Sequence, residues 1–380
     1  MKVLFISHEA TRTGAPLFLL HLCKYLKQNT DLELYFLIKR DGPLSEEFAN
    51  LGSTFIYQSS VSQSRNIVSR IRNRVVQLAI AKRLRSSIII NKLSRLKLDL
   101  IYSNTATNGA LLHELAGLNI KVVTHVHELE RVMQFFGVAN LDFVKQYSSY
   151  YISASPSVTR YFEGVVKKKI FEISCFPIHT VPAETASSSL RETLGIPTNA
   201  FVVGSAGTVE WRKGWDLFIR LAKDLKQSDA ERKVYFVWVG SISDRIKIDL
   251  QHELELAGLN HNVLFTGHKD NPIRYYAMFD VFCLMSREEA FGIVAIECAL
   301  YGMPVICFDK AEGLASFIQD DAGFVIPYLD TNKMAEAIGL LKDNEVVRTG
   351  MGKVALKRVK DNYRLEEQGE AVRSFLASIR

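Results

Sequence analysis

The sequence predicts an α/β protein made of two domains, each built around a mostly parallel sheet. Three observations lead to this fold class. Short apolar runs of strand length alternate with segments whose apolar residues recur at helical spacing, which is the pattern of βαβ units. A polar stretch divides this alternation into two series. The length of 380 residues exceeds one ordinary core and suits two domains.

The first series supplies the strands of an N-terminal domain, predicted to span residues 1–178. Helical patterns fall between its apolar runs, including 15–27 and 107–115. Since parallel strands joined by helices are covered on both faces, we expect these runs to be buried. The predicted strands are Lys2–Ser7, Leu32–Ile38, Thr54–Tyr57, Leu100–Tyr102, Lys121–His125 and Tyr150–Ala154.

The second series supplies a C-terminal domain, predicted to span residues 179–362. Residues 179–189 are polar and short of large apolar side chains, so they are interpreted as the connection between the domains. Residues 363–380 contain a final predicted helix. The predicted strands of this series are Phe201–Ser205, Tyr235–Val239, Val263–Thr266, Val281–Met285, Val305–Cys307 and Phe324–Ile326.

The composition indicates a globular protein of a reducing compartment. Hydrophobic residues make up 48% of the chain. The N-terminal apolar run meets charge too soon for a signal peptide, and no apolar run approaches the ~20 residues of a spanning helix. We therefore expect a cytoplasmic protein, with the inner face of the membrane as a further location. The five cysteines are odd in number and lack metal-ligand spacing, so reduced core residues are expected at Cys23, Cys175, Cys283, Cys298 and Cys307.

Positive charge is concentrated in the first half of the chain. Residues 1–178 hold 23 Lys and Arg against 13 Asp and Glu, whereas residues 179–380 hold 24 against 28. Residues 53–98 contain no acidic residue at all. Apolar residues recur at helical spacing among the basic ones, which predicts a basic amphipathic helix or helix pair over 65–97. The basic residues are Arg65, Arg70, Arg72, Arg74, Lys82, Arg83, Arg85, Lys92, Arg95 and Lys97.

This basic segment has three interpretations. It suits an anionic membrane surface, where each basic residue contributes about 1 kcal/mol. It also suits the solvated outer face of an ordinary helix. Nucleic acid is disfavoured, because the segment has no interleaved aromatic residues and the chain shows no recognisable nucleic-acid module.

The most informative segment runs from Ser286 to Glu297. It follows a buried strand and enters an apolar-periodic helix, so that Glu289 lies just before the helix and Glu297 about two turns into it. A ligand with hydroxyls at both ends and phosphate between them, such as a sugar nucleotide, fits this spacing. The alternative is a surface loop with two solvated glutamates. Unpaired N–H groups that would bind the phosphate are expected at Phe291, Gly292 and Ile293.

A second loop, residues 204–214, also suits a phosphate. It follows the first strand of the second domain, its glycines let the backbone approach a ligand, and Arg212 and Lys213 supply positive charge. Negative charge builds on a phosphate when it leaves, so fixed cations there stabilise the transition state more than the ground state. An ordinary basic surface turn is the alternative.

Two segments of the first domain are further candidates. Residues 8–16 join the first strand to a helix through a turn that contains Gly14, although an ordinary βα turn would look the same. His127 and His125 lie at the end of a predicted strand, where an imidazole would donate to a bound sugar; a satisfied core histidine is the alternative. Residues 103–109 follow another strand and are a further candidate loop, which would lie on the acceptor side if the family resemblance described next holds.

The segment 286–297, its Phe-Gly turn and the later Gly302-Met303-Pro304-Val305-Ile306 together resemble the Glu-x7-Glu signature of retaining GT-B glycosyltransferases of family 4, the glycosyl transferases group 1. The resemblance covers essentially the whole chain. It implies two Rossmann-like domains facing a central cleft, the first on the acceptor side and the second binding the nucleotide sugar. It also implies that the final helix packs back on the first domain.

The resemblance further implies roles for individual residues. Glu289 would bind hydroxyls of the donor sugar, and Glu297 the ribose. The arginine that usually follows the glycine of the phosphate loop is Thr208 here, so Arg212 is expected to replace it. The expected catalytic residues are Glu289, Lys213, Arg212 and His127, with His125 as the alternate histidine. The expected donor-binding residues are Gly14, Thr208, Phe291, Gly292, Ile293 and Glu297.

The resulting hypothesis is a retaining, metal-independent transferase. It would move a sugar from a nucleoside-diphosphate sugar to a sugar or lipid-linked acceptor in polysaccharide or glycolipid synthesis, by front-face attack with the leaving phosphate as base. No cofactor is expected, since the chain shows neither an Asp-x-Asp signature nor metal-ligand spacing of His and Cys. The alternatives are a nucleotide-sugar epimerase of the same architecture and a noncatalytic sugar-nucleotide-binding subunit.

Overall fold

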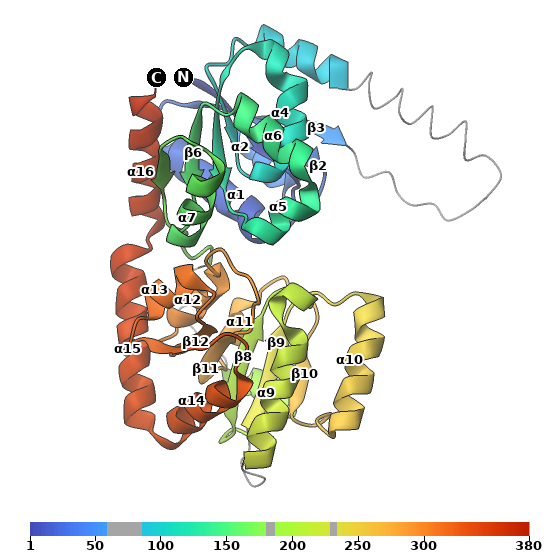
Figure 1. Ribbon diagram of the computed structural model, residues 1–380, viewed down its shortest axis with the longest axis vertical. Helices are drawn as coiled ribbons and strands as arrows, with labels where there is room; N and C mark the ends of the chain where they lie inside the picture. The colour runs from blue at the N-terminus through green and yellow to red at the C-terminus, as the bar shows by residue number, and fades with distance from the viewer. Residues whose placement is uncertain (59–85, 180–186, 229–233, 380) are drawn as a thin grey trace, which may run out of the picture. The chain divides into compact units, whose positions relative to one another are not determined.

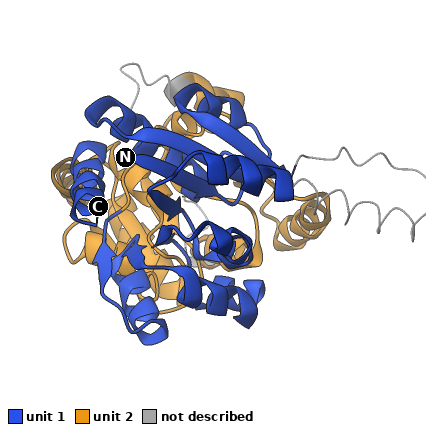
Figure 2. Cartoon of the chain, turned by 90° about the horizontal axis from the view of Figure 1, so that it is seen from above, with its two compact units in different colours: residues 1–174, 365–380 blue, residues 175–364 orange. Residues whose placement is uncertain are grey.

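The computed structural model describes residues 1–58, 86–179, 187–228 and 234–379. These residues form two compact units (Figure 2). Unit 1 comprises residues 1–174 and 365–380, and unit 2 comprises residues 175–364. The sequence placed the boundary four residues later, after Ile178, because the polar stretch begins there.

Unit 1 is built on a seven-stranded sheet in the order β3-β2-β1-β4-β5-β6-β7, with every neighbouring pair parallel. The six predicted strands are all present. The seventh, β7, has only three residues and follows three lysines, so it carries no apolar run that sequence reading could detect. The strands are β1 (Lys2–Ser7), β2 (Glu33–Arg40), β3 (Ser53–Gln58), β4 (Leu100–Ser103), β5 (Lys121–Val126), β6 (Tyr150–Ser153) and β7 (Ile170–Glu172).

Helices connect these strands and pack on the sheet (Figure 1). The predicted helix 107–115 divides into a 3-10 turn, η1 (Ala106–Asn108), and the helix α4 (Gly109–Leu115). A second 3-10 turn is η2 (Ala116–Leu118), and residues 86–95 are also helical. The other helices described in unit 1 are α1 (Gly14–Asn29), α2 (Ser45–Leu51), α5 (Glu130–Phe136), α6 (Val138–Tyr147), α7 (Pro156–Val165) and α16 (Leu365–Ser378).

The C-terminal helix α16 returns to unit 1 and packs beside α1. A Cβ at Gly369 would lie 2.3 Å from Cδ1 of Tyr25, so the two helices approach at a position without a side chain. The Phe375 ring lies 4.4 Å from the Phe171 ring and 6.1 Å from that of Tyr150, centre to centre. Aromatic pairs at these separations are stabilising beyond the area that they bury.

Unit 2 repeats the same design on a six-stranded parallel sheet in the order β10-β9-β8-β11-β12-β13. Its strands are β8 (Phe201–Ala206), β9 (Val234–Val239), β10 (Val263–Phe265), β11 (Val281–Leu284), β12 (Val305–Phe308) and β13 (Gly323–Ile326). Its helices are α8 (Ser187–Thr193), the 3-10 turn η3 (Trp211–Lys213), α9 (Trp215–Ser228), α10 (Asp244–Ala257), α11 (Ile273–Tyr276), α12 (Ile293–Ala299), α13 (Glu312–Ile318), α14 (Thr331–Asp343) and α15 (Glu345–Asn362).

Each sheet reverses its strand order at one point, between β1 and β4 in unit 1 and between β8 and β11 in unit 2. The loops that leave the carboxyl ends of two such strands diverge to opposite faces of the sheet. Open parallel sheets bind ligands at this switch point. The topology therefore indicates a ligand site at the loops after β1 and β4 in unit 1 and at those after β8 and β11 in unit 2.

All five cysteines are buried thiols, as the sequence predicted. Burial raises the pKa of the Cys283 thiol and of the Cys307 thiol, both of which lie inside the sheet of unit 2. Such thiols are protonated at neutral pH and act as small apolar side chains.

The basic segment predicted over 65–97 lies largely outside the described residues, which resume at residue 86. Its proposed membrane contact therefore stays a prediction. Within the described parts of the chain, no helix is both long and apolar enough to cross a membrane.

We predict that Phe375→Ala destabilises unit 1. Phe375 is 5% exposed and fills the space between β6, β7 and α16, so its removal leaves a cavity and should lower the free energy of unfolding by about 3 kcal/mol. Urea unfolding measures the change. The matched control is Phe135→Ala, because Phe135 is 86% exposed. Equal unfolding midpoints for both variants would show that α16 contributes little to unit 1.

Candidate functional site

The loops that follow β8 and β11 contact each other directly at the switch point of unit 2. The N–H of Arg287 donates to the carbonyl of Arg212 (2.8 Å). Gly214 makes this approach possible: its φ is +77°, and a Cβ there would lie 2.1 Å from the Met285 carbonyl oxygen. Only glycine fits a left-handed conformation against another backbone.

This contact brings Lys213 and Glu289 together. Lys213 Nζ and Ser286 Oγ both donate to Oε2 of Glu289, the serine at 2.9 Å. The side chains of Lys213 and Glu289 are 16% and 11% exposed. Burial alone would raise the pKa of Glu289, but the charges of Lys213 and Arg212 hold it below its ordinary value. Glu289 is thus an ionised carboxylate, and no described residue donates to its second oxygen, Oε1.

The glycine turn after β8 lies beside the stem of Lys213. Gly207 has φ +133°, and a Cβ there would lie 3.5 Å from Cδ of Lys213. The Gly207 carbonyl oxygen accepts a hydrogen bond from Trp238 Nε1 at 2.8 Å. A Cβ on Gly240 would lie only 1.9 Å from the same oxygen, so Gly240 has no room for a side chain. The next residue, Thr208, is exposed. The N–H groups of Gly207 and Val209 already donate to backbone carbonyls, so among the described residues only Thr208 offers this turn's unpaired N–H to an anion beside Lys213.

Arg212 already has protein partners. Its guanidinium donates to Glu210 (2.9 Å) and to the carbonyl of Glu288 (3.1 Å). It therefore braces the Glu289 loop as well as contributing positive charge to that carboxylate. Thr208 occupies the position at which the family usually has an arginine. To replace that arginine, Arg212 would have to bind a phosphate while it keeps or exchanges these contacts.

Arg287 holds the same two loops together, a role that sequence analysis missed. It makes two hydrogen bonds to Asp216 (2.9 and 2.6 Å) and one to the carbonyl of Trp211 (2.6 Å). Its guanidinium carbon also lies 4.4 Å from the centre of a ring of Trp211. Bidentate pairing and stacking of this kind are specific to arginine.

The helix α12 begins at Ile293, after Gly292 in a left-handed conformation (φ +88°). Phe291 is buried, with its ring 5.4 Å from that of Tyr363. Among the described residues, the N–H groups of Phe291, Gly292 and Ile293 have no backbone acceptor. The three N–H groups that the sequence analysis singled out thus lack a backbone partner at the start of α12, where Phe291 and Gly292 are buried and Ile293 is half-buried.

Glu297 lies within α12 and is nearly buried, with 7% of its side chain exposed. One oxygen, Oε1, accepts three hydrogen bonds: from the N–H groups of Ile178 (3.1 Å) and His179 (3.2 Å) and from His179 Nδ1 (2.8 Å). No described residue donates to Oε2. Sequence analysis did not identify this partner, because His179 lies 118 residues earlier in a stretch interpreted only as a connection.

The switch point of unit 1 also gathers polar side chains. Asn104, which follows β4, donates to the carbonyl of Ala15 at the start of α1 (2.7 Å). Its amide oxygen lies 3.2 Å from His127 Nε2. The structure therefore brings two predicted candidates, the Gly14 turn and His127, to opposite sides of one asparagine. Gly14 itself is exposed and is the first residue of α1.

The two histidines after β5 differ in accessibility. His125 is fully buried, with Nδ1 2.7 Å from the Tyr102 hydroxyl, whereas His127 is partly exposed. Their ring centres are 4.2 Å apart, and each ring forms a T-shaped pair with that of Phe18. Burial lowers the pKa of His127 to about 3 and that of His125 well below its ordinary value, so both are neutral at pH 7. Of the two, only His127 is positioned to meet a ligand.

Glu128 joins the loops after β4 and β5 and was not among the predicted residues. Its carboxylate accepts from the Thr105 hydroxyl, from the N–H of Ala106 (3.1 Å) and from the N–H of His127 (3.1 Å). Burial raises the pKa of Glu128 against the effect of these hydrogen bonds. Their result is a fixed backbone at His127.

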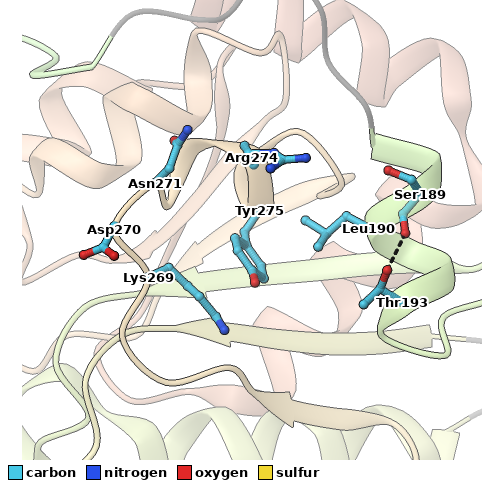
Figure 3. Close-up of a pocket in the computed structure, with 8 residues that line it drawn as sticks. All are labelled: Ser189, Leu190, Thr193, Lys269, Asp270, Asn271, Arg274 and Tyr275. Atoms are coloured by element: carbon cyan, nitrogen blue, oxygen red, sulfur yellow. Dashed lines mark hydrogen bonds between the residues drawn. The ribbon is translucent and has the colours of Figure 1, made fainter.

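A cavity of about 270 Å³ lies elsewhere in unit 2, between α8 and the segment that leads into α11 (Figure 3). Lys269 Nζ lies 5.4 Å from the centre of the Tyr275 ring at its wall. The lining contains none of the predicted site residues; it consists of Ser189, Leu190, Thr193, Lys269, Asp270, Asn271, Arg274 and Tyr275. Across the described ranges, no three His, Cys, Asp or Glu side chains are grouped so that they could hold a metal ion.

Comparison with known proteins agrees with this architecture. Residues 187–358, most of unit 2, match the family model of the glycosyl transferases group 1. The chain is similar in structure to HepE of Anabaena, solved with UDP and glucose, with a TM-score of 0.82 and 20% identity over the full length of both chains. The chain therefore has the GT-B fold, and its similarity to the group 1 model lies in unit 2.

Two curated relatives match in sequence. The lipopolysaccharide core mannosyltransferase LpcC of Rhizobium leguminosarum is 25% identical over 52% of this chain and 56% of its own length. The capsular polysaccharide glycosyltransferase CapM of Staphylococcus aureus is 28% identical over 43% of this chain and 42% of its own. The chain thus matches about half of the length of these relatives.

We predict that Gly214→Ala destabilises unit 2. A left-handed alanine costs about 1–2 kcal/mol, and the contact with the Met285 carbonyl forces the two loops apart, so the free energy of unfolding should fall by at least about 2 kcal/mol. Chemical denaturation tests this. In the matched control Gly350→Ala, the new methyl group meets no atom within 4 Å in the helix α15, so that variant should be as stable as the parent or slightly more so. Equal stability of the two variants would contradict the close approach.

We also predict that acid destabilises unit 1 through His127. Below pH 6.5 the unfolded chain protonates this histidine while the folded protein, with a pKa of about 3, does not. Stability is therefore lost as pH falls from 6.5 towards 3, by up to about 1.4 kcal/mol per pH unit. His127→Asn should lose about 2 kcal/mol less than the parent between pH 6.5 and 5. The exposed His252, replaced in the same way, serves as control. An identical acid loss in His127→Asn and parent would show that His127 is not buried in its neutral form.

Proposed function

We propose that this protein, a GT-B chain whose residues 187–358 match the glycosyl transferases group 1, is a retaining, metal-independent glycosyltransferase of family 4. It would transfer a sugar from a nucleoside-diphosphate sugar to a sugar or lipid-linked acceptor in polysaccharide or glycolipid synthesis. The observation that carries the proposal is the Lys213–Glu289 pair at the switch point of unit 2. It places a cation and an ionised carboxylate beside an exposed glycine turn.

Lys213 would act on the leaving group. When the bond to the sugar breaks, negative charge collects on the β-phosphate, and a nearly buried ammonium stabilises this charge more strongly than one in water. The N–H groups at residues 291–293 would also stabilise the negative charge on the β-phosphate. Arg212 would contribute positive charge from beside the Glu289 loop.

Glu289 would orient the donor sugar. Its Oε2 is occupied by Lys213 and Ser286, which leaves Oε1 to accept hydrogen bonds from sugar hydroxyls. The same two donors draw charge from the carboxylate and make it a weak nucleophile. We therefore propose front-face attack by the acceptor, with the leaving phosphate as the base, in preference to a covalent glycosyl-enzyme.

Relatives guide the choice of donor and acceptor. HepE was solved with UDP and glucose, LpcC is described as a mannosyltransferase of lipopolysaccharide core and CapM as an enzyme of capsular polysaccharide. We propose a uridine-diphosphate sugar as donor and a surface polysaccharide or its lipid-linked precursor as acceptor. His127, held neutral with Nε2 donating to the amide oxygen of Asn104, would accept a hydrogen bond from a sugar hydroxyl through Nδ1. A cytoplasmic protein that meets the inner face of the membrane through residues 65–97 would suit such an acceptor.

We predict that Glu289→Gln lowers transfer at least about 100-fold, because the neutral amide neither pairs with Lys213 nor accepts as strongly from the donor hydroxyls. The assay is the release of UDP from a panel of UDP-sugars in EDTA, with slow hydrolysis by water as the reaction where no acceptor is supplied.

The matched control is Glu370→Gln, which makes the same change in an ion pair with Arg373 on the outer side of α16 and should keep full activity. Parent-like UDP release by Glu289→Gln would contradict the assigned site. Release that requires a divalent cation in the parent would contradict metal independence.

A further inference from the structure

We propose that His179 is a positioning residue of the donor site, which holds Glu297 so that one carboxylate oxygen is presented to the ribose hydroxyls of the nucleotide. The inference deepens the proposed function and rests on it, because it takes Glu297 as the ribose-binding group. It assigns a nucleotide-binding task to a residue outside both of the loops described above.

The hydrogen bonds at Glu297 determine which oxygen a ligand can use. Oε1 receives three donors, two from the backbone of Ile178 and His179 and one from the imidazole. Three donors at 2.8 to 3.2 Å saturate a carboxylate oxygen. The ligand must therefore approach Oε2, to which no residue in the described part of the chain donates.

His179 contributes the one side-chain donor in this set. Tyr276 and Tyr301 lie close enough for the charge of Glu297 to help raise the pKa of each phenol, after the larger effect of burial. Tyr301 nevertheless donates its hydroxyl to the carbonyl of Ile273 (3.0 Å). A nearly buried carboxylate needs a donor with fixed direction, and the His179 imidazole, which is 31% exposed, supplies it.

The contact also links two parts of the chain that sequence separates. His179 follows the start of unit 2 by four residues, and Glu297 lies in α12, which begins beside the Lys213–Glu289 pair. The imidazole thus fixes the far end of the signature segment while Lys213 fixes the near end. Both ends of a nucleotide sugar would then meet carboxylates that were oriented before the ligand arrives, which reduces the entropic cost of binding.

The test compares the affinity for UDP with that for 2′,3′-dideoxy-UDP, which lacks the hydroxyls that Glu297 would bind. Titration calorimetry in EDTA is applied to the parent, to His179→Leu and to His179→Asn. Leucine removes the donor, whereas the asparagine amide nitrogen occupies nearly the place of Nδ1. His179→Ala provides a smaller apolar variant should leucine disturb the fold.

We expect the parent to bind UDP about tenfold more tightly than the dideoxy compound, as one or two hydrogen bonds to a charged group would give. His179→Leu and His179→Ala should bind UDP about tenfold more weakly, with the dideoxy affinity changed less than twofold. His179→Asn should restore most of the preference. A purely structural role would weaken both nucleotides equally, and asparagine would not restore the ratio.

Glu297→Gln distinguishes a failure of the role inferred for His179 from a failure of the assignment of Glu297 to the ribose. If the parent prefers UDP and Glu297→Gln loses the preference, while His179→Leu and His179→Ala keep it, the inference about His179 is wrong and the donor site stands. If Glu297→Gln keeps the preference, or if the parent binds neither nucleotide, the assignment of Glu297 to the ribose is wrong and the inference falls with it.

Discussion

The ion pair between Lys213 and Glu289 joins two segments that lie 76 residues apart, and the rest of the candidate site depends on it. A carboxylate as buried as Glu289 is costly unless it is paired, so the fold must bring a cation to it. Gly214 lets η3 touch the end of β11, and Arg287 with Asp216 and Trp211 prevents the loops from separating. Each of these contacts keeps the loops after β8 and β11 together, so that Lys213 and Glu289 can pair.

The two units apply one architectural rule with different chemistry. In each, polar residues follow the strands at the switch point, and a buried glutamate fastens neighbouring segments: Glu128 in unit 1 and Glu297 in unit 2. In unit 1 burial keeps the two histidines after β5, His125 and His127, uncharged. In unit 2 the loops after β8 and β11 meet through an ion pair. A neutral hydrogen-bonding surface suits sugar hydroxyls, and an ionic one suits a diphosphate.

Sequence analysis predicted the features that a local pattern of residues encodes. It predicted twelve of the thirteen strands that the structure describes, because buried parallel strands are continuous apolar runs, and it located Lys213, Glu289 and the start of α12 from strand–turn–helix order. It missed β7, which has three residues and no apolar run. It also missed His179, Glu128 and Arg287, since their partners lie far away in the chain and their own neighbourhoods look like ordinary loops. For Arg212, the sequence supplied the charge but not the contacts with Glu210 and Glu288 that already engage it.

The most direct measurement is a crystal structure of the protein with UDP, grown without a divalent cation. The account predicts the β-phosphate within hydrogen-bond distance of Lys213 Nζ and of the N–H groups at 291–293, with the ribose hydroxyls at Oε2 of Glu297. UDP seated in the cavity between α8 and α11, or held only through an added metal ion, would contradict it.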